Sequence, residues 1–383
     1  MSSADPKRYV LPEIVFGRGA MDLVDSYVQG YGSRSVLVVS DPGVERAGWT
    51  SRVLRSIERA GAATILFDGV TPNPRAGEVA AGLELCRSKG CDLIIAVGGG
   101  SPMDCAKGIA VCAANGGSIL DYEGIDRIPV PTLPLICVPT TAGSAADVSQ
   151  FAIITDPARR IKIAVVSRRI VPDVALVDPE ATETMDPELT AATGMDALSH
   201  AVEAYVSTGA SPLTDLDALR AATLVQRALV RAWRDGRDAE ARDMMAQACL
   251  FAGKAFSNAS LGLVHAMAHA LGGYADAPHG LCNALLLEAV AKANGPAAAP
   301  RYDDLARAMG EEPRRGDEPG AAFARAVARL RRDLGLGSTL AAVGLRAEDI
   351  PTLALNASRD PCMATNPRRL GVEEIGEIYA WAL

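Results

Sequence analysis

Histidine occurs only four times in this 383-residue chain, at positions 200, 265, 269 and 279, and Asp196 lies four residues before the first of them. Imidazole and carboxylate groups bind divalent transition metals without sulfur. A chain that uses histidine nowhere else, yet clusters it beside an acid, most simply builds one metal centre. The cluster therefore predicts a metal site.

The spacing of these residues indicates how they could meet. Asp196 and His200 are four residues apart, as are His265 and His269, so each pair would project from one face of a helix. His279 follows a loop and is expected to begin another helix. Two helix faces and a loop can enclose one ion in a roughly tetrahedral shell. Surface neighbours or satisfied core residues are the alternatives, and spacing alone leaves open which three of the four histidines bind the metal.

A glycine turn is the second candidate site. The segment Leu93–Gly108 has the pattern of an apolar strand, a turn of Gly98, Gly99, Gly100 and Ser101, and a helix. Three glycines let the backbone approach a phosphate closely, and the N–H groups that begin a helix point at the anion. The segment lacks the G-x-G-x-x-G fingerprint, so a tight strand–helix turn without a ligand is the alternative to a pyrophosphate site.

The same segment predicts how its helix begins. Ser101 suits the N-cap and Pro102 the first helical position, and Asp104 would complete an S-x-x-D capping box. These assignments would align the helix N-terminus with the glycine turn.

Asp41 is a candidate for cofactor selection. It follows the predicted strand Ser35–Ser40, at the carboxyl edge where open α/β sheets bind ligands. A carboxylate there can accept hydrogen bonds from both ribose hydroxyls of NAD, and it repels the 2′-phosphate of NADP. Asp41 therefore favours NAD. The alternative is that it only caps the backbone of an Asp-Pro-Gly turn.

The elements that would position these residues differ between the two halves of the chain. Up to about residue 187, apolar runs alternate with amphipathic segments such as Trp49–Ala60 and Ala76–Lys89, which is typical of a parallel sheet covered on both faces. Phe151–Thr155 and Ile161–Val166 are predicted to pair as a hairpin. The predicted sheet strands are Ser35–Ser40, Ala63–Phe67, Leu93–Val97, Leu135–Val138 and Val174–Val177.

From Pro187 onward the pattern is helical, with breaks expected at the Gly- and Pro-containing stretches 209–212, 272–280 and 295–300. The predicted fold is an α/β dinucleotide-binding (Rossmann-like) domain over residues 1–187, followed by an all-α metal-binding domain over residues 188–383.

Composition excludes several classes of protein. A net charge of −8 argues against a nucleic-acid partner, because phosphate binding needs a basic face. No run of about 18 apolar residues predicts a membrane span, and the first residues lack the apolar region of a secretion signal. Eight scattered cysteines without a C-x-x-C pair favour reduced thiols. We therefore expect a cytoplasmic protein without membrane insertion.

The chain contains six motifs that match a known family: GGGSPMDCAK (98–107), PTTAGSAADVS (139–149), DP (178–179), TAATGMDALSHAVEAY (190–205), AFSNASLGLVHAMAHALGG (255–273) and PHGLCNALLL (278–287). With them the chain closely resembles the iron-containing (group III) alcohol dehydrogenases over nearly its full length. The resemblance implies a homodimer or larger assembly, iron as the metal with zinc possible, and NAD(H) as the cofactor.

The resemblance also implies a role for individual residues. The metal ligands would be Asp196, His200, His265 and His279, while His269 would lie free beside the nicotinamide. Phe256 and Cys362 would border the substrate pocket. With Gly98 and Gly99 of the turn, the implied cofactor contacts are Asp41, Asn73, Gly100, Ser101, Thr140, Thr141, Ser149, Phe151, Lys162, Thr182 and His269.

The chain departs from the family pattern in two places. The usual AGTxxE becomes Gly143–Asp147, which ends in an acid one methylene shorter than the common Glu, and Thr182 stands where relatives tend to carry Leu or Met. Neither change touches a predicted ligand. They bear on the shape of the pocket.

The expected reaction is reversible hydride transfer between a small primary alcohol, or its aldehyde, and NAD(H). The metal would act as a Lewis acid on the substrate oxygen, and His269 would pass the alcohol proton toward solvent. Both a neutral and an anionic aldehyde fit the sequence. The alternatives are a polyol oxidoreductase resembling glycerol dehydrogenase, a metal-free reductase, which the intact ligand set argues against, a metallohydrolase and a non-catalytic metal-binding protein.

Overall fold

A parallel sheet of six strands lies at the centre of the first half of the chain in the computed structural model, which describes residues 7–337 and 339–383. Its order is β1-β9-β6-β4-β2-β3, and each neighbouring pair is parallel. The inner strands are buried on both faces, as their continuous Val, Ile and Leu runs require. The strands are β1 (Glu13–Phe16), β9 (Val174–Val177), β6 (Leu135–Pro139), β4 (Leu93–Gly98), β2 (Ser35–Val39) and β3 (Ala63–Phe67).

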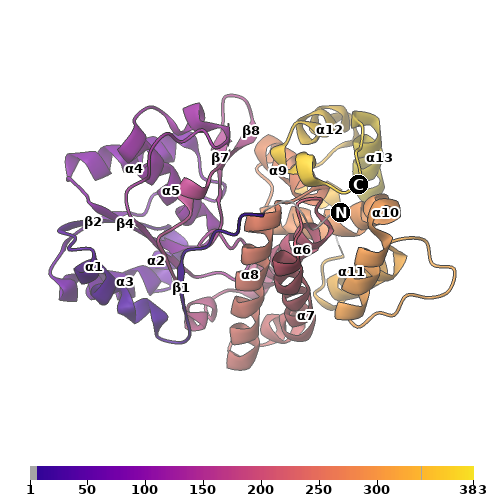
Figure 1. The fold of residues 1–383 in the computed structure, drawn as a ribbon, viewed down its shortest axis with the longest axis horizontal. Coiled ribbons are helices and arrows are strands. Elements are labelled where there is room, and N and C mark those ends of the chain that lie inside the picture. Colours follow the sequence, from indigo (N-terminus) through magenta and orange to yellow (C-terminus); the bar gives the residue numbers. More distant parts are fainter. Residues whose placement is uncertain (1–6, 338) are drawn as a thin grey trace.

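Helices cover both faces of this sheet (Figure 1). α1 (Val24–Gly30) and α3 (Trp49–Ala60) pack on one face, while α4 (Ala76–Ser88) and α5 (Gly100–Asn115) pack on the other. A short helix, α2 (Pro42–Arg46), follows β2. The first half is therefore the predicted α/β layer structure.

A smaller sheet packs beside α5. It has the order β5-β8-β7, in which β7 (Phe151–Asp156) and β8 (Ile161–Val166) form an antiparallel hairpin and β5 (Gly124–Ile125) runs parallel to β8. Apolar side chains of this hairpin share a core with α5. The hairpin brings Phe151 and Lys162 to the cavity described below.

The predicted strands are confirmed within one residue at each end. Two strands were missed, β1 and β5. The sequence of β1, Glu-Ile-Val-Phe, is short and only partly buried, so it lacks a continuous apolar run. It forms because the edge of β9 offers its hydrogen-bonding groups along the whole register from Glu13 to Phe16.

The second half of the described chain is helical and contains no strand, as predicted. Asp186 caps its first helix by accepting a hydrogen bond from the N–H of Leu189, and Pro187 occupies the first helical position. The helices are α6 (Pro187–Val206), α7 (Pro212–Arg234), α8 (Ala239–Ala259), α9 (Leu263–Ala275), α10 (His279–Ala308), α11 (Ala321–Asp333), α12 (Ile350–Ser358) and α13 (Val372–Ala382).

The predicted helix breaks are only partly right. The chain breaks at 209–212, between α6 and α7, and again within 272–280, where α9 ends at Ala275 and α10 begins at His279. α10 runs through Pro296 and Pro300 and kinks at Ala298 instead of ending. Residues on both sides of the kink are buried in one core. Tertiary packing therefore keeps both segments helical, although the prolines remove backbone hydrogen bonds of the helix.

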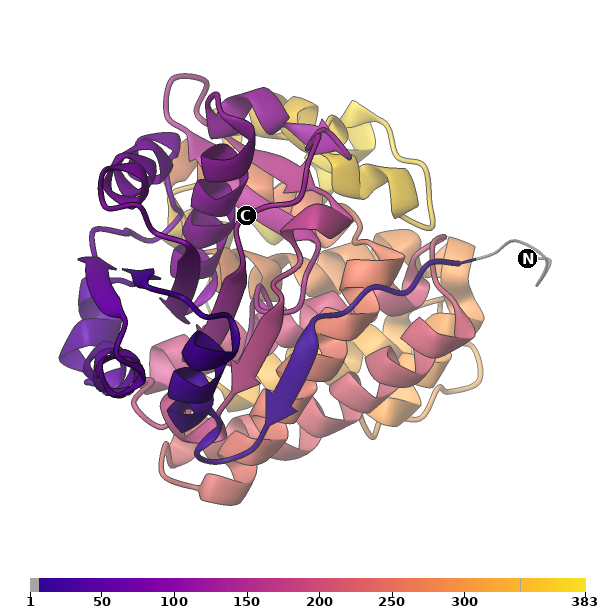
Figure 2. The same cartoon turned by 60° about the vertical axis from the view of Figure 1, so that its left-hand side comes forward.

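The N-terminal segment crosses from the helical half to the sheet (Figure 2). Tyr9 donates a hydrogen bond to Asp217 on α7, and the N–H of Val10 donates to Asn258 on α8 at 2.7 Å. The chain then enters β1 at the sheet edge. The two halves are thus joined by this segment as well as by the connection from β9 to α6.

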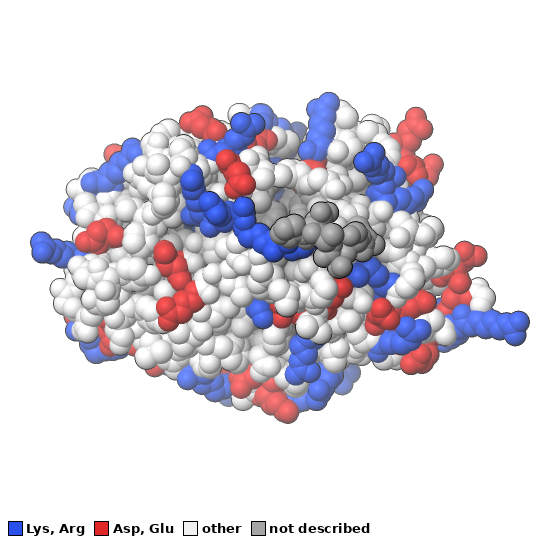
Figure 3. Space-filling view, in the orientation of Figure 1, with Lys and Arg blue, Asp and Glu red and all other residues white. Residues whose placement is uncertain are grey.

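The charged surface and the cysteines complete the description of the fold. On the face drawn in Figure 3, basic and acidic side chains are interspersed over the surface. Among the described helices, none combines the length and the apolar character needed to cross a bilayer. All eight cysteines are free thiols.

Candidate active site

A cavity of about 980 Å³ lies between the carboxyl edge of the parallel sheet and helices of the second half. Turns after β2, β4 and β6 line one part, and α6, α9 and the start of α10 line another. Three predicted residues, Gly98, Thr182 and Cys362, are not among its lining residues. The predicted residues that line it are Asp41, Asn73, Gly99, Gly100, Ser101, Thr140, Thr141, Ser149, Phe151, Lys162, Asp196, His200, Phe256, His265, His269 and His279.

The glycine turn connects β4 to α5 in a conformation that needs glycine. Gly98 has a φ of +151°, and a Cβ at this position would lie 2.7 Å from Cγ of Pro102. A Cβ at Gly100 would lie 2.9 Å from that of Ser144. Gly98 therefore shapes the turn, although it does not line the cavity itself.

The predicted cap of α5 is wrong. The helix begins at Gly100 with Gly99 as its N-cap, and no described side chain caps it. Asp104 does not complete a capping box but accepts a hydrogen bond from the N–H of Ile153 on β7 at 3.1 Å. The hydrogen-bond donor for this carboxylate comes from a hairpin that lies far away in the sequence. The local sequence around Asp104 therefore does not indicate this contact. The uncapped N–H groups of the first turn lie at the cavity and can donate hydrogen bonds to an anion.

Asp41 caps the backbone, the alternative role predicted for it, and it also lies at the cavity. It caps α2, because its Oδ1 accepts hydrogen bonds from the N–H groups of Gly43 at 2.8 Å and Val44 at 3.0 Å. The same side chain lines the cavity. Backbone capping by one oxygen is compatible with a ribose contact by the other, and that contact stays a prediction.

Two lysines hold loops that line the cavity. Lys162 on β8 donates to Oδ1 of Asn73 at 2.7 Å, and Asn73 donates to Asp276 after α9 at 2.7 Å. Lys107 on α5 is fully buried and donates to the carbonyls of Ser149 at 3.0 Å and Phe151 at 2.7 Å. These contacts fix the loops that carry Asn73, Ser149 and Phe151.

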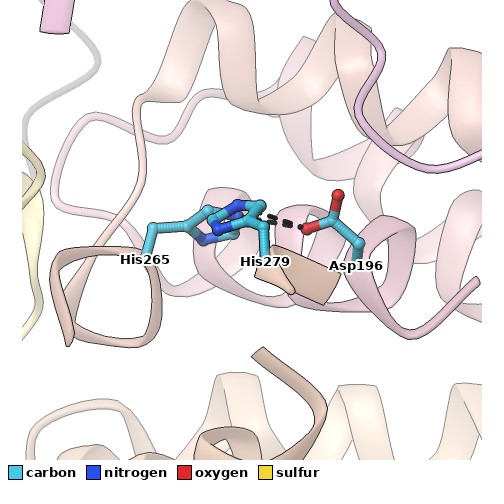
Figure 4. Close-up of side chains that lie close together, drawn as sticks. All are labelled: Asp196, His265 and His279. Atoms are coloured by element: carbon cyan, nitrogen blue, oxygen red, sulfur yellow. Dashed lines mark ion pairs between the residues drawn. The ribbon is translucent and has the colours of Figure 1, made fainter. Parts of the chain in front are cut away.

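Asp196 is the centre of the predicted metal site. Its Oδ1 lies 3.6 Å from Nε2 of His265, 3.7 Å from Nε2 of His279 and 3.9 Å from Nε2 of His200. α6 carries Asp196 and His200, α9 carries His265, and His279 is the first residue of α10, as predicted. The ligand atoms of Asp196, His265 and His279 all lie within 4.8 Å of one another (Figure 4).

Hydrogen bonds at Nδ1 orient three of the four imidazole rings. Nδ1 of His200 lies 3.1 Å from the carbonyl of Gly143, and Nδ1 of His265 lies 2.7 Å from Glu203. Nδ1 of His269 lies 2.9 Å from Asp360. A partner on Nδ1 leaves Nε2 as the free nitrogen, which is how proteins prepare histidine to bind a metal.

Burial and charge adjust the protonation of this cluster. Burial lowers the pKa of His200 to about 4 and that of His279 well below its usual value, so both rings are neutral at pH 7. Burial opposes the charge of Asp196, but the facing imidazoles of His200 and His279 hold its pKa well below the usual range. Burial also opposes a proton on His265, yet the hydrogen bonds that its ring donates to Asp196 and Glu203 raise its pKa to about 9. A cation must displace that proton.

Asn283 lies against the same atoms. Its Nδ2 is 2.7 Å from Oδ1 of Asp196, 3.2 Å from Nε2 of His265 and 3.3 Å from Nε2 of His279. The Nδ1 atom of His279 is buried without a partner among the described residues. One carboxylate oxygen and several imidazole nitrogens thus converge on one point, with the amide N–H₂ of Asn283 between them. Carboxylate and imidazole together form a ligand set that suits a divalent cation.

Phenylalanine rings border this cluster. Phe256 stacks on the ring of His200 with centroids 4.2 Å apart, and Phe151 packs against Phe256 at 5.7 Å. Two other predicted contacts lie elsewhere: Thr182 donates to the carbonyl of Pro179 at 2.7 Å, and Cys362 is buried behind the cavity wall. Their cofactor and substrate roles stay predictions without support from the cavity lining.

Three residues that hold the cluster were not predicted as site residues. Glu203 and Asn283 lie in matched motifs and follow a predicted ligand on the same helix at i+3 (His200) and i+4 (His279), so helical spacing could have found both. Asp360 is 91 residues from His269 and no sequence pattern connects the two. Only the fold brings Asp360 to the site.

Comparison with known proteins assigns both halves of the chain to one family. The family described as "Iron-containing alcohol dehydrogenase" matches residues 12–179, and the one described as "Fe-containing alcohol dehydrogenase family, C-terminal" matches residues 190–383.

Individual relatives agree over almost the whole chain. Alcohol dehydrogenase 4 of Schizosaccharomyces pombe is 44% identical over 96% of this chain and 87% of its own length. An NAD-dependent methanol dehydrogenase of Bacillus methanolicus is 39% identical over 98% of this chain and 99% of its own length. The crystal structure of a 1,3-propanediol oxidoreductase superposes with a TM-score of 0.94 at 39% identity, covering 99% of this chain and 100% of that chain.

Proposed function

We infer the function from one premise: this chain belongs to the iron-containing alcohol dehydrogenase family. It is a metal-dependent oxidoreductase that uses NAD(H). The observation that carries the finer assignment is the presence, in one cavity, of a cation-binding donor set and an uncapped helix N-terminus. An acid with three imidazoles suits a metal, and the helix N-terminus suits a pyrophosphate.

We propose that Asp196, His200, His265 and His279 hold the metal. Support comes from the burial of Asp196, His200 and His265, the separations of 3.6 to 3.9 Å from Asp196 Oδ1 and the Nδ1 partners that turn Nε2 of His200 and His265 toward Asp196. Fe²⁺ is the proposed ion and Zn²⁺ its competitor, because both accept imidazole and carboxylate. When bound, the ion would act as a Lewis acid on the substrate oxygen.

We assign His269 to proton transfer. It lines the cavity, and its Nδ1 is held by Asp360, outside the group formed by Asp196, His265 and His279. In alcohol oxidation the hydroxyl proton leaves to a base while a hydride goes to NAD⁺, giving an aldehyde, NADH and one proton. Nε2 of His269 is the free nitrogen that would accept that proton.

The proposed substrate is a small, neutral primary alcohol or its aldehyde. Phe151, Phe256 and Leu261 supply apolar surface to the cavity. Arg46 and Lys162 are the only Lys or Arg side chains among its lining residues. Arg46 lies on α2 with Asp41, and Lys162 already donates to Asn73. Because Phe256 stacks on His200 and Phe151 packs against Phe256, the surface beside the histidine cluster is apolar, which favours the neutral aldehyde of the two that the sequence allows.

The test is a substrate panel on protein purified without oxygen and loaded with Fe²⁺ or Zn²⁺. NADH oxidation is followed with neutral C2 to C4 aldehydes and with carboxy-, sulfo- and phosphono-aldehydes of matched length. We expect turnover of the neutral series and none with Asp196→Asn. Turnover of the anionic series alone would refute the substrate assignment. Metal and NADH binding without turnover of any aldehyde would instead favour a non-catalytic metal-binding protein.

Two further proposals concern the whole protein. We propose a homodimer or larger homo-oligomer, supported by the exposed Leu213 and Leu216 at the start of α7, which are 58% and 73% accessible. We also propose a cytoplasmic location, supported by eight free thiols. Light scattering and cell fractionation test these two points.

A further inference from the structure

His269 is held by a carboxylate from a distant part of the chain. Asp360 precedes a short 3₁₀ helix, Pro361–Thr365, and its Oδ2 lies 2.9 Å from Nδ1 of His269. Its other oxygen, Oδ1, accepts the backbone N–H of Cys362 at 2.8 Å. The side chains of His269 and Asp360 are 6% and 8% exposed, so little water competes for the contact.

We propose that Asp360 is a positioning residue that holds His269 as the tautomer with its proton on Nδ1 and its lone pair on Nε2. An ionised carboxylate can only accept hydrogen bonds, so the imidazole nitrogen that faces it must carry the proton. The lone pair then lies on Nε2, the other ring nitrogen of a side chain that lines the cavity, whereas Asp360 does not line it.

The catalytic consequence rests on the proposed function. A ring that takes the hydroxyl proton of an alcohol needs a lone pair on the cavity side, and the opposite tautomer would present an N–H there. Asp360 would thus act on the reaction through His269, without touching substrate or cofactor.

The neighbouring ring on the same helix is held in the same way. Glu203 contacts Nδ1 of His265, four residues before His269 on α9. His265 belongs to the close group with Asp196 and His279, whereas His269 belongs to a separate group with Asp360 and Cys362. One helix therefore carries two imidazoles, each with a carboxylate on Nδ1, and only one of them shares atoms with the metal site.

Asp360→Asn is the informative change because it keeps the volume and alters the hydrogen bonding. Asp360 accepts twice, from Cys362 N–H and from His269, whereas asparagine has one acceptor and one N–H₂ donor. If the asparagine oxygen keeps the Cys362 contact, its nitrogen faces Nδ1 of His269. That geometry demands a lone pair on Nδ1 and moves the ring proton to Nε2.

The first readout is the tautomer itself, which needs no turnover. Because the chain has four histidines, long-range ¹H–¹⁵N spectra of histidine-labelled protein contain four rings, and His269→Ala identifies one of them. Spectra are recorded metal-free and with diamagnetic Zn²⁺. We expect an Nδ1-protonated His269 in the wild type and a switch in Asp360→Asn. An Nε2-protonated His269 in the wild type overturns the proposal, whatever the activity.

The second readout is a double-mutant cycle on kcat. Asp360→Asn should lower kcat by about 10- to 100-fold with an unchanged metal content, as loss of a group that orients a functional histidine does. In the His269→Ala background, the same change should have an effect of less than about 2-fold. A further large loss in that background, or loss of metal, would show that Asp360 acts through the fold or the metal and would overturn the proposal.

A matched control lies on the same helix. Tyr379 donates a buried hydrogen bond to the carbonyl of Met267 at 2.7 Å, two residues from His269. Tyr379→Phe should lower Tm by roughly 2 to 4 °C while leaving kcat and the His269 tautomer unchanged. If the tautomer is as proposed but the wild type turns over no alcohol or aldehyde, the proposed function fails and the positioning of His269 stands.

Discussion

At the scale of single residues, the cluster shows how identical side chains receive different tasks. All four imidazoles lie close together, with the rings of His265 and His269 6.0 Å apart. What separates them is the partner at Nδ1 and the distance from Nε2 to Asp196, which is short for His200, His265 and His279. His269 instead has Asp360 as its carboxylate partner and lies outside the group that Asp196 forms with His265 and His279.

This division gives a direct test with two variants. His265→Ala should abolish stoichiometric metal binding, because it removes a proposed ligand from the cluster. His269→Ala should keep the metal and lower turnover by about 100-fold or more, as loss of an acid–base group does. Metal analysis of both purified variants, with kcat for the second, measures the difference. Equal metal content in both variants would contradict the assignment.

Asp147 gives a pH-dependent prediction. Burial raises its pKa from 3.8 to about 6, against the opposing effect of its own backbone hydrogen bond and Lys107. Because the folded-state pKa is raised, its stabilising effect is complete below pH 3.8 and is lost as the pH rises through 6.

Asp147→Asn should therefore gain stability relative to the wild type between pH 4 and pH 7, by up to about 3 kcal/mol. Urea unfolding of both proteins at several pH values measures this difference. A difference that stays constant with pH would show that Asp147 is ionised in the folded protein throughout the range.

At the scale of elements, local pattern predicted most of what builds the site. The strands that end at the cavity are long apolar runs, and the i, i+4 pairs lie on α6 and α9 as expected. Three features depend on packing between distant segments, so local pattern could not predict them. They are the kink of α10, the hydrogen bond that Asp104 accepts from β7 and the approach of Asp360 to α9. Each of these depends on contacts far apart in sequence.

The start of α10 gives a prediction at this scale. Gly280 follows His279, and a Cβ there would lie 2.4 Å from the carbonyl oxygen of Ala192 on α6. Gly280→Ala should push α10 away from α6, destabilise the protein by roughly 1 to 3 kcal/mol and weaken metal binding by moving His279 from Asp196. Thermal unfolding and metal titration measure the two effects.

Gly77 is the matched control. It is also the second residue of a helix, α4, but nothing lies within 4 Å of a Cβ built there. Gly77→Ala should stabilise the protein by about 0.5 to 1 kcal/mol, because it only restricts the unfolded chain. Equal effects of the two substitutions would mean that α6 and α10 adjust freely.

At the scale of the whole molecule, the two-part architecture was predictable and the ties between the parts were not. Apolar strands alternating with helices, followed by helices alone, indicate an α/β half and a helical half. Nothing in Tyr9 or Val10 indicates that this segment lies on α7 and α8 before the sheet begins. Such contacts depend on the final surface, not on periodicity.

The metal should stabilise the entire fold. Its proposed ligands come from α6, α9 and α10, so binding joins three helices of the second half. An ion at a free concentration a hundred times its Kd should add about 2.7 kcal/mol of stability, and chelation should remove it. Differential scanning calorimetry with Fe²⁺, with Zn²⁺ and with chelator measures this. Asp196→Asn should show little shift, and an equal shift in that variant would place the stabilising ion elsewhere.

The segment that crosses between the halves has a consequence for biosynthesis. Tyr9 and its partner Asp217 are 208 positions apart. β1 pairs with β9 in a register that begins with Glu13 opposite Val174. At about 5 to 20 residues per second, a ribosome needs roughly 10 to 40 s to deliver the partner of Tyr9. The edge strand therefore waits, unpaired, while the middle of the sheet can already form. That interval exposes the unpaired edge strand of the nascent chain to chaperones, and slow codons in the stretch that precedes position 217 would lengthen it.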